Sequence, residues 1–553
     1  MLPRIRMRAP ASAMGGKLWT RDMVVRDKER FVCRNYSAAC YSSRSRPSFE
    51  TDMAVETELK LRISPEHLAR LKRHALLKEY QVARPLTRRL YNVYYDTPKL
   101  DLHRAMMALR LRRVGGKWLQ TLKGGGDVRA GLHSRNEWEI PVGGEALEFP
   151  PSPEWDEHLP RPLRKKLRPV FVTDFTRTTR LLDWHGSRIE VCLDHGEIRT
   201  EQHSLPICEL ELELKSGEPG KLFELALAIL DVVPCELEVV NKAEYGFRLL
   251  AGQAERPVKG ALPDIAAAAT LPEMLQALIW SCLLHLQANL RGATASDDAE
   301  YLHQMRIALR RLRVVLRMAA RYRADEQLAA LGEEIAALGV ALGCIRDWDV
   351  FIAGVLEPMR ERMPGHPGLQ ALLAASEHRR SMCHLELHGE EEARDLQRLI
   401  LRFALWMNGP YWSRPDGDAP RDFAARLLRK LSRRFAAAAQ QIDPPEAGRL
   451  HALRICAKKL RYGSEFFAPL YGRRSADDYL ASLGRVQDVL GLINDVAVAH
   501  RLLDGLAAGP ELVAHQEAVA LAKGWIAHGL SRQTGILHKA LRRFEEQPAF
   551  WKG

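Results

Sequence analysis

Two widely separated segments of the chain alternate charged and apolar residues in an order unlike that of an ordinary half-buried strand. They are ETELKLR at 56–62 and ELELELK at 209–215, with carboxylates and then a cation at every second position. Alternate side chains of a β-strand share a face, so each segment would present one charged face and one largely apolar face. Gathered carboxylates repel one another unless they are protonated or hold cations. Hard divalent metals are natural occupants of such a site. The pair predicts a barrel with a charged interior and an outer face covered by protein.

The length and charge of the chain set broad limits on its architecture and partners. At 553 residues it has room for at least two domains of ordinary size. Its net charge of +13 favours polyanions as partners without saying which one. Residues 1–52 are Arg- and Ser-rich with little apolar periodicity. We expect them to be a disordered extension, or the product of a start assigned upstream of Met53.

Cysteine usage points to a reducing compartment. The nine cysteines are scattered, odd in number and without a CxxC pair, so we expect reduced thiols in a cytoplasmic protein rather than a disulfide framework or a zinc site. They are Cys33, Cys40, Cys192, Cys208, Cys235, Cys282, Cys344, Cys383 and Cys456. We find no apolar run of the roughly 18 residues that span a bilayer, so no membrane partner is expected.

Strand patterns dominate residues 53–252. Period-2 alternation between Gly, Pro and Asp residues predicts strands at 54–62, 87–96, 107–114, 117–123, 133–141, 177–184, 187–195, 197–203 and 207–215. Helices are predicted at 65–77, 219–231 and 242–251. About eight antiparallel strands can close into a barrel with room for one small ligand. The first domain is therefore predicted to be an antiparallel β-barrel with flanking helices.

Alternation also predicts which side chains line the barrel. The charged faces of the other strands carry Arg110, Arg112, Lys123, Arg135, Glu137, Glu139, Arg188, Glu190 and Asp194. Cations can grip phosphate oxygens, and carboxylates can hold metal ions that bridge to those oxygens, so this lining suits a metal-bound polyphosphate. The alternative is a set of exposed strand faces with surface ion pairs. Five strands share this arrangement, with a charged face predicted to turn inward and an apolar face outward, which favours the lined tunnel.

These segments together resemble the CYTH family, also called triphosphate tunnel metalloenzymes. The resemblance covers about 53–252 and is carried, in order, by MAVETELKLRIS, YYDTPKLDLHRAMMALRLRR, LQTLKG, SRNEWEIPV, GSRIEVCLDHGEI, ELELELKSG and NKAEYGFRLL. It implies an eight-stranded tunnel and hydrolysis of a triphosphate that depends on Mg²⁺ or Mn²⁺. The ELELELKSG form looks most like the bacterial inorganic triphosphatase branch.

The resemblance also implies roles for individual residues. The implied metal ligands are Glu56, Glu58, Glu137, Asp194, Glu211 and Glu213. The implied substrate-binding residues are Lys60, Arg110, Arg112, Lys123, Arg188 and Lys242. The implied catalytic residues are Glu56, Glu58, Lys60, Glu211 and Glu213. The sequence leaves open the register of Glu139, Glu209, Glu190, Arg135, Arg177 and Lys215.

After a linker at about 253–270, residues 271–545 read as a helical domain that contains an internal repeat. HxxRxxxRRLR at 303–313 recurs as HxxRxxxKKLR at 451–461, an offset of 148 residues (451 − 303). LGCIRD at 342–347 recurs as LGLIND at 490–495 with the same offset (490 − 342). Equal offsets predict two copies of one helical unit, packed about a pseudo-twofold axis.

The repeated motif places cations on one helix face at steps of three and four. Two such stripes facing each other would form a basic groove, whereas a single stripe is more often a solvated helix face. These residues resemble the CHAD domain, an all-helical family. That resemblance implies polyphosphate binding by His303, Arg306, Arg310, Arg313, His451, Arg454, Lys458 and Arg461.

The sequence therefore predicts an α+β multi-domain protein: an eight-stranded antiparallel tunnel, then a helical bundle with a twofold repeat. We expect hydrolysis of inorganic triphosphate in the tunnel, polyphosphate binding by the helices, and a cytoplasmic location associated with polyphosphate granules. One alternative is an organic triphosphatase acting on thiamine triphosphate or a nucleotide. Another is a non-catalytic polyphosphate scaffold. Nucleic acid is a rival ligand of the basic helices that we do not expect.

Overall fold

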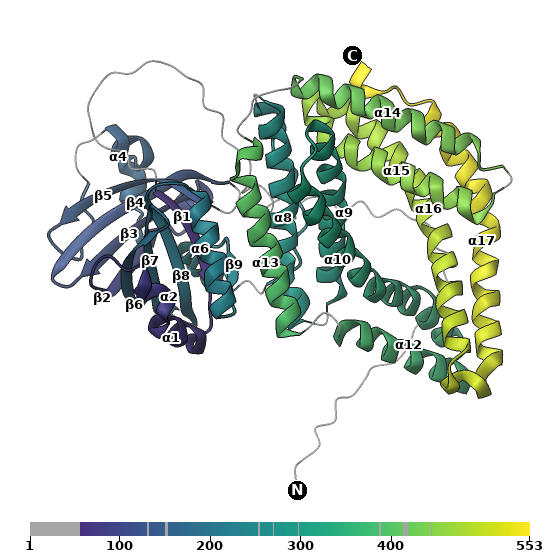
Figure 1. The fold of residues 1–553 in the computed structure, drawn as a ribbon, viewed down its shortest axis with the longest axis horizontal. Helices are drawn as coiled ribbons and strands as arrows, with labels where there is room; N and C mark the ends of the chain where they lie inside the picture. Colours follow the sequence, from purple (N-terminus) through teal and green to yellow (C-terminus); the bar gives the residue numbers. More distant parts are fainter. Residues whose placement is uncertain are drawn as a thin grey trace, which may run out of the picture.

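The chain folds into a β-barrel followed by a larger array of helices (Figure 1). The computed structural model describes residues 56–129, 132–149, 153–252, 255–268, 270–296, 298–385, 389–412, 418–443 and 445–552. The extension predicted at 1–52 lies outside the described residues. The barrel and helical array predicted from the sequence are thus confirmed, in that order along the chain.

Eight antiparallel strands, β1 to β8, close the barrel, and a short ninth strand pairs with β1. The strands are β1 Glu56–Arg62, β2 Leu86–Asp96, β3 Met107–Val114, β4 Lys117–Arg129, β5 Leu132–Val142, β6 Arg168–Trp184, β7 Ser187–Arg199, β8 Ser204–Ser216 and the short β9 Glu236–Glu238. They pair in the order β5-β4-β3-β2-β6-β7-β8-β1-β9, and a further pairing of β5 with β1 closes the ring. The separate strand expected at 197–203 is wrong, because β7 continues through Arg199 before a short turn.

Helices cover the apolar outer face of β1, β7 and β8. Leu59 and Leu61 on β1, and Leu210 and Leu212 on β8, are fully inaccessible to solvent. The covering helices are α1 Pro65–Arg73, α2 Ala75–Glu79 and α6 Gly220–Val232. Small helices lie elsewhere on the barrel: α3 Asp101–Arg104, α4 Pro153–His158, α5 Arg161–Arg164 and α7 Lys242–Leu250. Burial of the leucine face turns the charged face of each strand inward.

The helical half is built from long helices. They are α8 Leu271–Ala295, α9 Ala299–Tyr322, α10 Glu326–Phe351, α11 Glu357–Arg362, α12 Pro367–Leu385, α13 Glu390–Met407, α14 Pro420–Gln440, α15 Ala447–Phe467, α16 Arg473–Ala507 and α17 Gln516–Glu545. The two His/Arg motifs lie on α9 and α15, which begin 148 residues apart (447 − 299). The pseudo-twofold arrangement of the two copies stays a prediction.

The barrel and the helices share one hydrophobic core. A continuous cluster of buried side chains runs from the barrel leucines through α6 to α8 and α13, which stand beside the barrel in Figure 1. At this junction the Gln397 side chain accepts a hydrogen bond from the Leu237 N–H (3.1 Å), and Gln287 donates one to the Leu237 carbonyl (2.7 Å). Both backbone groups of this β9 residue are thus held by helices of the second half.

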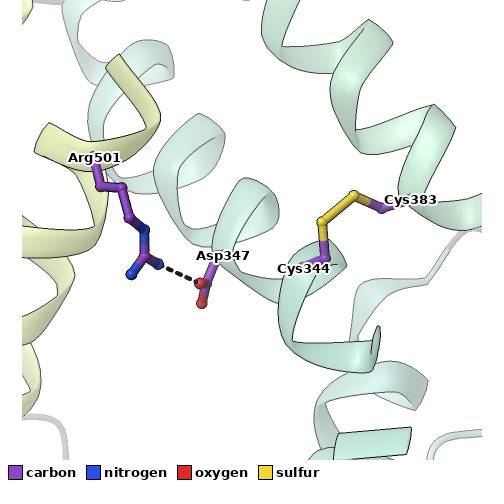
Figure 2. The surroundings of a disulfide bond; sticks show 4 residues. All are labelled: Cys344, Asp347, Cys383 and Arg501. Atoms are coloured by element: carbon purple, nitrogen blue, oxygen red, sulfur yellow. Dashed lines mark hydrogen bonds and ion pairs between the residues drawn. A yellow bond between two sulfur atoms is a disulfide. The ribbon is translucent and has the colours of Figure 1, made fainter. Parts of the chain in front are cut away.

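One disulfide corrects the expectation that all cysteines are reduced. Cys344 on α10 is bonded to Cys383 on α12, as Figure 2 shows. Facing helices bring together two cysteines that lie 39 residues apart in the chain, a proximity that their spacing does not reveal. The free cysteines among the described residues are Cys192, Cys208, Cys235, Cys282 and Cys456. Cys33 and Cys40 lie outside the described residues.

One helical stretch differs from the sequence expectation about membrane spans. Glu326–Arg362, which includes α10 and α11, is long and apolar enough to cross a membrane by length and composition alone. The mean hydropathy of its most apolar window is 1.8. The core helix of a globular protein passes the same test but is mostly buried, whereas 28% of this window is buried; a single stretch of this kind is weak evidence. Here α10 packs against α9, α12 and α16.

Candidate active site in the barrel and a basic cleft between helices

Three carboxylates meet deep inside the barrel. Asp194 on β7 lies directly opposite Glu209 on β8, and Glu211 is the next inward-facing residue of β8. Their exposed fractions are 0%, 6% and 8%, and their oxygen atoms lie within 4.8 Å of one another. Because directly opposed side chains on paired strands lie close together, the alternation of Asp and Glu along these strands creates the cluster.

Three cations hold this carboxylate cluster together. The Lys242 ammonium, at the first residue of α7, lies 2.7 Å from Asp194 and 3.0 Å from Glu211. Arg177 on β6 donates two parallel hydrogen bonds to Asp194 (2.8 and 2.6 Å) and a third to Glu211. Lys60 on β1 donates to Glu211 at 2.7 Å. Each cation is mostly or fully removed from solvent, so the charges interact with little screening.

The pKa values of Glu209 and Glu211 are shifted in opposite directions. Burial raises the pKa of Glu209 to about 7, although Lys242 opposes the shift. Burial acts the same way on Glu211, but Arg177, Lys242 and Lys60 outweigh it and hold the pKa of that carboxyl well below its ordinary value. At neutral pH the cluster therefore combines a permanently ionised carboxylate with one that takes up a proton readily.

The opposite wall of the barrel is predominantly cationic. Lys123 on β4 and Arg110 on β3 approach Glu137 on β5, at 2.6 and 3.4 Å. Arg112 on β3 donates to the neutral side chain of Asn92 on β2 (2.9 Å). Burial and the nearby charges of Arg110 and Arg177 lower the pKa of Arg112 to about 10. A bound anion would relieve this repulsion between cations.

A second row of carboxylates lies one step toward the barrel mouth. Glu190 on β7 is opposite Glu213 on β8, and Glu213 is opposite Glu58 on β1. The Lys60 ammonium lies 3.1 Å from Glu58, and the Lys215 ammonium lies 2.5 Å from Glu213. The side chains of Glu58 and Glu213 are 20% and 21% exposed, so this row is accessible from solution.

A second concentration of charge lies between α9 and α15. Burial lowers the pKa values of Arg306 on α9 and of Arg454 and Lys458 on α15, and repulsion among these residues and Arg310 on α9 lowers them further. Burial, then Arg454, Arg310 and Arg306, lower the pKa of Lys458 to about 7. Buried side-chain nitrogens of Arg306, Arg310 and Arg454 have no hydrogen-bond acceptor among the residues that the structure describes. We call these four residues the α9–α15 cleft.

Acidic residues on neighbouring helices border the cleft. Asp347 on α10 forms an ion pair with Arg501 on α16 at 3.2 Å (Figure 2). Burial raises the pKa of Asp347, while Arg306 and Arg501 oppose the shift. His303 is half-buried beside the cleft, and burial and the charge of Arg346 lower its pKa. The acids orient the cations but do not balance them.

Two protein-family models match the chain, one over the barrel and one over the helical half. The CYTH domain matches residues 54–234, and the CHAD domain matches residues 277–504. The chain joins a CYTH domain to a CHAD domain.

Individual relatives agree with this assignment. Over 209 residues the chain is 35% identical to an inorganic triphosphatase of Haemophilus influenzae, covering 36% of this chain and 56% of that protein. The chain thus spans about half the length of this curated relative. The CHAD domain from Ricinus communis is 30% identical, covers 52% of this chain and 97% of its own, and gives a TM-score of 0.44. A putative adenylyl cyclase from Hippeastrum with a dominant triphosphatase activity is 21% identical. The alignment covers 36% of this chain and 97% of that one, with a TM-score of 0.28. The assignment of both domains therefore depends on the two family models and not on these structural alignments.

The CYTH barrel brings most of the predicted site residues together, with one clear exception. Arg188 lies near the start of β7, is 44% exposed and pairs with Asp183 at 3.5 Å, away from the cluster. Alternation gives a side chain's face but not its depth along the strand, and substrate binding by Arg188 stays a prediction. Arg177 and Glu209, whose register the sequence left open, lie at the centre. The side chain of Glu56 lies outside the described residues.

The CHAD helices bring together part of the predicted polyphosphate set. Arg306, Arg310, Arg454 and Lys458 form the cleft, with His303 beside it. Arg461 instead donates to Glu465 (2.8 Å) and Gln487 (3.1 Å). Burial and the charge of Arg317, rather than of a cleft residue, lower the pKa of Arg313, and His451 is exposed.

CYTH domains are metalloenzyme domains, and the carboxylates of this barrel fit a hard cation. Oxygen donors of this kind are what Mg²⁺, Mn²⁺ or Ca²⁺ require. The deep cluster of Asp194, Glu209 and Glu211 already contacts three cations, whereas Glu58 and Glu213 are nearer to solvent. The predicted ligand Glu137 lies on the opposite wall with Arg110 and Lys123.

Sequence reasoning missed two residues of the cationic wall. Asn92 and Tyr94 share the inward face of β2, are 1% and 4% exposed, and contact Arg112 and Arg110. Burial would raise the pKa of Tyr94, but Arg110 and Arg112 lower it overall. An Asn in the middle of an otherwise apolar and aromatic strand was the available signal.

Proposed function

We propose that the CYTH domain hydrolyses inorganic triphosphate to diphosphate and phosphate, and that the CHAD domain binds inorganic polyphosphate. The observation that carries the proposal is the closed barrel whose interior sets a cationic wall against buried carboxylates. Arg and Lys donate strongly to phosphate oxygens, and carboxylates hold hard cations, so the chamber suits a short, highly charged phosphate chain. The identity to an inorganic triphosphatase supports this substrate.

Mg²⁺ or Mn²⁺ is the proposed cofactor. Glu58, Glu211 and Glu213 would hold it, because they lie on the two adjacent strands whose acidic rows reach toward the barrel mouth. The ion, when bound, would neutralise phosphate oxygens and stabilise the charge that develops during phosphoryl transfer.

The residues of the chain would supply positioning and charge. Arg110, Arg112 and Lys123 would grip the phosphate oxygens from the cationic wall. Lys60 and Arg177 would fix the carboxylates that face the substrate, through the ion pairs described above. A carboxylate of the cluster would orient the water for in-line attack on a terminal phosphorus. Catalysis of this kind depends mainly on positioning and electrostatic stabilisation.

Two other functions for the barrel remain distinct alternatives. An organic triphosphatase would turn over thiamine triphosphate or a nucleotide faster than inorganic triphosphate. A non-catalytic scaffold would release no phosphate from any of them. Side-by-side turnover of inorganic triphosphate, thiamine triphosphate and ATP, each with and without EDTA, separates the three. We expect inorganic triphosphate to be the best substrate and EDTA to abolish its turnover.

The unneutralised cations of the α9–α15 cleft support polyphosphate binding. Nucleic acid is the competing ligand, and both interactions weaken as salt rises, so competition must be measured at one fixed salt concentration. We expect polyphosphate to displace DNA at equal phosphate concentration. We also propose a cytoplasmic location associated with polyphosphate granules. The five free cysteines support this location, while the Cys344–Cys383 bond weighs against it.

A further inference from the structure

A groove separate from the α9–α15 cleft follows one face of α14. Two adjoining hollows of about 510 and 290 Å³ lie along this helix. Arg426, Lys430 and Arg434 contribute to their lining at successive turns of α14. The end of α9 adds Arg321 and Arg323, and α15 adds Lys459. We call this surface the α14 groove.

The cations of the α14 groove are almost unopposed. Within the described residues, no hydrogen bond or ion pair joins Arg321, Arg434 or Lys459 to an acceptor. The one acidic residue of the lining, Asp418, pairs with Arg426. Burial, then the charges of Arg434 and Arg317, lower the pKa of Arg321. The α14 groove therefore has the same electrostatic character as the α9–α15 cleft.

A comparison at the 148-residue offset shows how this imbalance arises. Arg311 on α9 has an acidic partner, Glu465, at 3.2 Å. The corresponding residue of the second copy is Lys459 (311 + 148), and the position corresponding to Glu465 is Arg317 (465 − 148). An ion pair between the two copies is thus matched, at the corresponding positions with the copies exchanged, by two repelling cations.

The linker accounts for a second difference between the two copies. Asn289 on α8 binds both backbone groups of Val258, at 2.9 Å each, and Arg311 donates to the Gly260 carbonyl. The linker thereby covers the groove between α8 and α9. At the same offset Asn289 corresponds to Ala437, which lines the open groove between α14 and α15.

We propose that the α14 groove is a second binding site for inorganic polyphosphate. The inference rests on the proposed polyphosphate binding of the CHAD domain and adds a site to it. The lining offers mainly Arg and Lys donors, which match a ligand that carries only acceptor oxygens. An acidic peptide would also bring N–H donors, for which the lining offers Gln441, Tyr322 and an Asp418 carboxylate that already pairs with Arg426. Nucleic acid bases would need aromatic platforms, but Phe423 is buried and the Tyr322 ring already packs against Tyr411 and Arg323.

The geometry of α9 links the two sites. Arg310, Arg313, Arg317 and Arg321 follow one another at steps of three and four on this helix, from the cleft to the groove. From Arg306 to Arg321 the helix rises about 22 Å at about 1.5 Å per residue. A polyphosphate chain longer than this can occupy both sites at once, so it binds more tightly than a chain that reaches only one.

The test compares three variants of the intact chain that each lose three basic side chains. The groove variant is Lys430→Ala/Arg434→Ala/Lys459→Ala. The cleft variant is Arg306→Ala/Arg454→Ala/Lys458→Ala. The control is Arg161→Ala/Lys165→Ala/Lys166→Ala, which removes exposed cations from the barrel. Binding of long-chain polyphosphate is measured by calorimetry over a series of salt concentrations, with the fold of each variant checked by circular dichroism.

We expect the groove variant to lose at least tenfold in affinity and to show a shallower salt dependence than the control, because fewer counterions are displaced. The cleft variant should keep measurable binding that disappears when both sets are combined. A groove variant that binds like the control overturns the second site and leaves the cleft standing. Absence of binding by the unaltered chain overturns both proposals. Tighter binding of polyglutamate or DNA to the groove overturns the ligand class. If the triple variant unfolds, Lys430→Gln/Arg434→Gln carries the same test.

Discussion

At the scale of single residues, burial decides which charges are present at neutral pH. Glu209 and Lys458 both titrate near pH 7, one in the barrel and one in the α9–α15 cleft, because both have lost solvent. The sequence predicts where acids and bases alternate but not how deeply each is buried. For this reason it placed Lys458 in the basic stripe without showing that burial lowers the pKa of its ammonium, and placed Arg188 on the charged face of β7 without showing that its side chain is 44% exposed.

We expect the titration of Lys458 to make the proposed polyphosphate binding depend on pH. Below a pKa of about 7 the side chain is charged in the free protein, and above it the side chain is neutral. A bound anion favours the charged form, so binding takes up a proton and weakens as pH rises from about 6.5 to 8.5. Lys458→Met should flatten the dependence of affinity on pH. Lys539→Met, which removes an exposed lysine of α17, should leave it unchanged. Calorimetry at three pH values checks it, and equal slopes in the two variants would contradict it.

Arg177 and Arg188 provide a matched pair within the barrel. Arg177→Ala leaves Asp194 and Glu211 short of a buried partner, so we expect a loss of roughly 3 kcal/mol in unfolding free energy. Triphosphatase activity should fall with it. Arg188→Ala removes only an exposed pair and should change stability by less than about 1 kcal/mol. Urea unfolding and phosphate release measure both effects. Similar losses in the two variants would refute the placement of these side chains.

At the scale of elements, strand alternation predicted the barrel well and boundaries less well. The β1 and β8 patterns fix which face turns inward, because one apolar face must be covered. Strand β6 begins at Arg168 rather than 177, since its first residues show no clean alternation, and β9 is too short to be recognised. The contacts of α13 with β9 join segments about 160 residues apart, which no local pattern reveals.

The docking of β9 gives a prediction about Gln397. This side chain is 2% exposed and accepts the Leu237 N–H, so Gln397→Leu leaves a buried donor unsatisfied. We expect unfolding free energy to fall by about 1–3 kcal/mol. Arg398→Ala, which breaks the exposed pair with Asp231 on the same surface, should cost less than about 1 kcal/mol. Denaturant titration of both variants measures these changes in unfolding free energy. An unchanged unfolding free energy in Gln397→Leu would show that β9 docks without this hydrogen bond.

The disulfide between α10 and α12 gives a second prediction at this scale. Closing a loop of 39 residues restricts the unfolded chain, which is worth up to roughly 4 kcal/mol. Cys344→Ser/Cys383→Ser should therefore unfold at lower denaturant concentration and lose any response to dithiothreitol. The unaltered chain should respond to it. Detection of two free thiols at these positions in the folded protein would contradict the bond.

At the scale of the whole molecule, a barrel that we propose acts on short phosphate chains is joined through one hydrophobic core to a helical array that we propose binds long ones. The order of the two domains was predictable, because each is marked by its own motif set along a long stretch of chain. The shared core and the covered groove between α8 and α9 were not, since they depend on how distant apolar faces meet. The net charge of +13 is consistent with a polyanion in both halves.

The central claim is that the barrel interior hydrolyses inorganic triphosphate. The most direct test measures phosphate release from inorganic triphosphate with Mg²⁺ or Mn²⁺, using the intact chain and Glu58→Gln/Glu213→Gln. The control is Glu79→Gln/Glu157→Gln, which alters two exposed acids of the same domain. We predict metal-dependent release by the unaltered chain and the control, and a loss of at least a hundredfold in the barrel variant. Well-folded unaltered protein that releases no more phosphate than the barrel variant would contradict the claim.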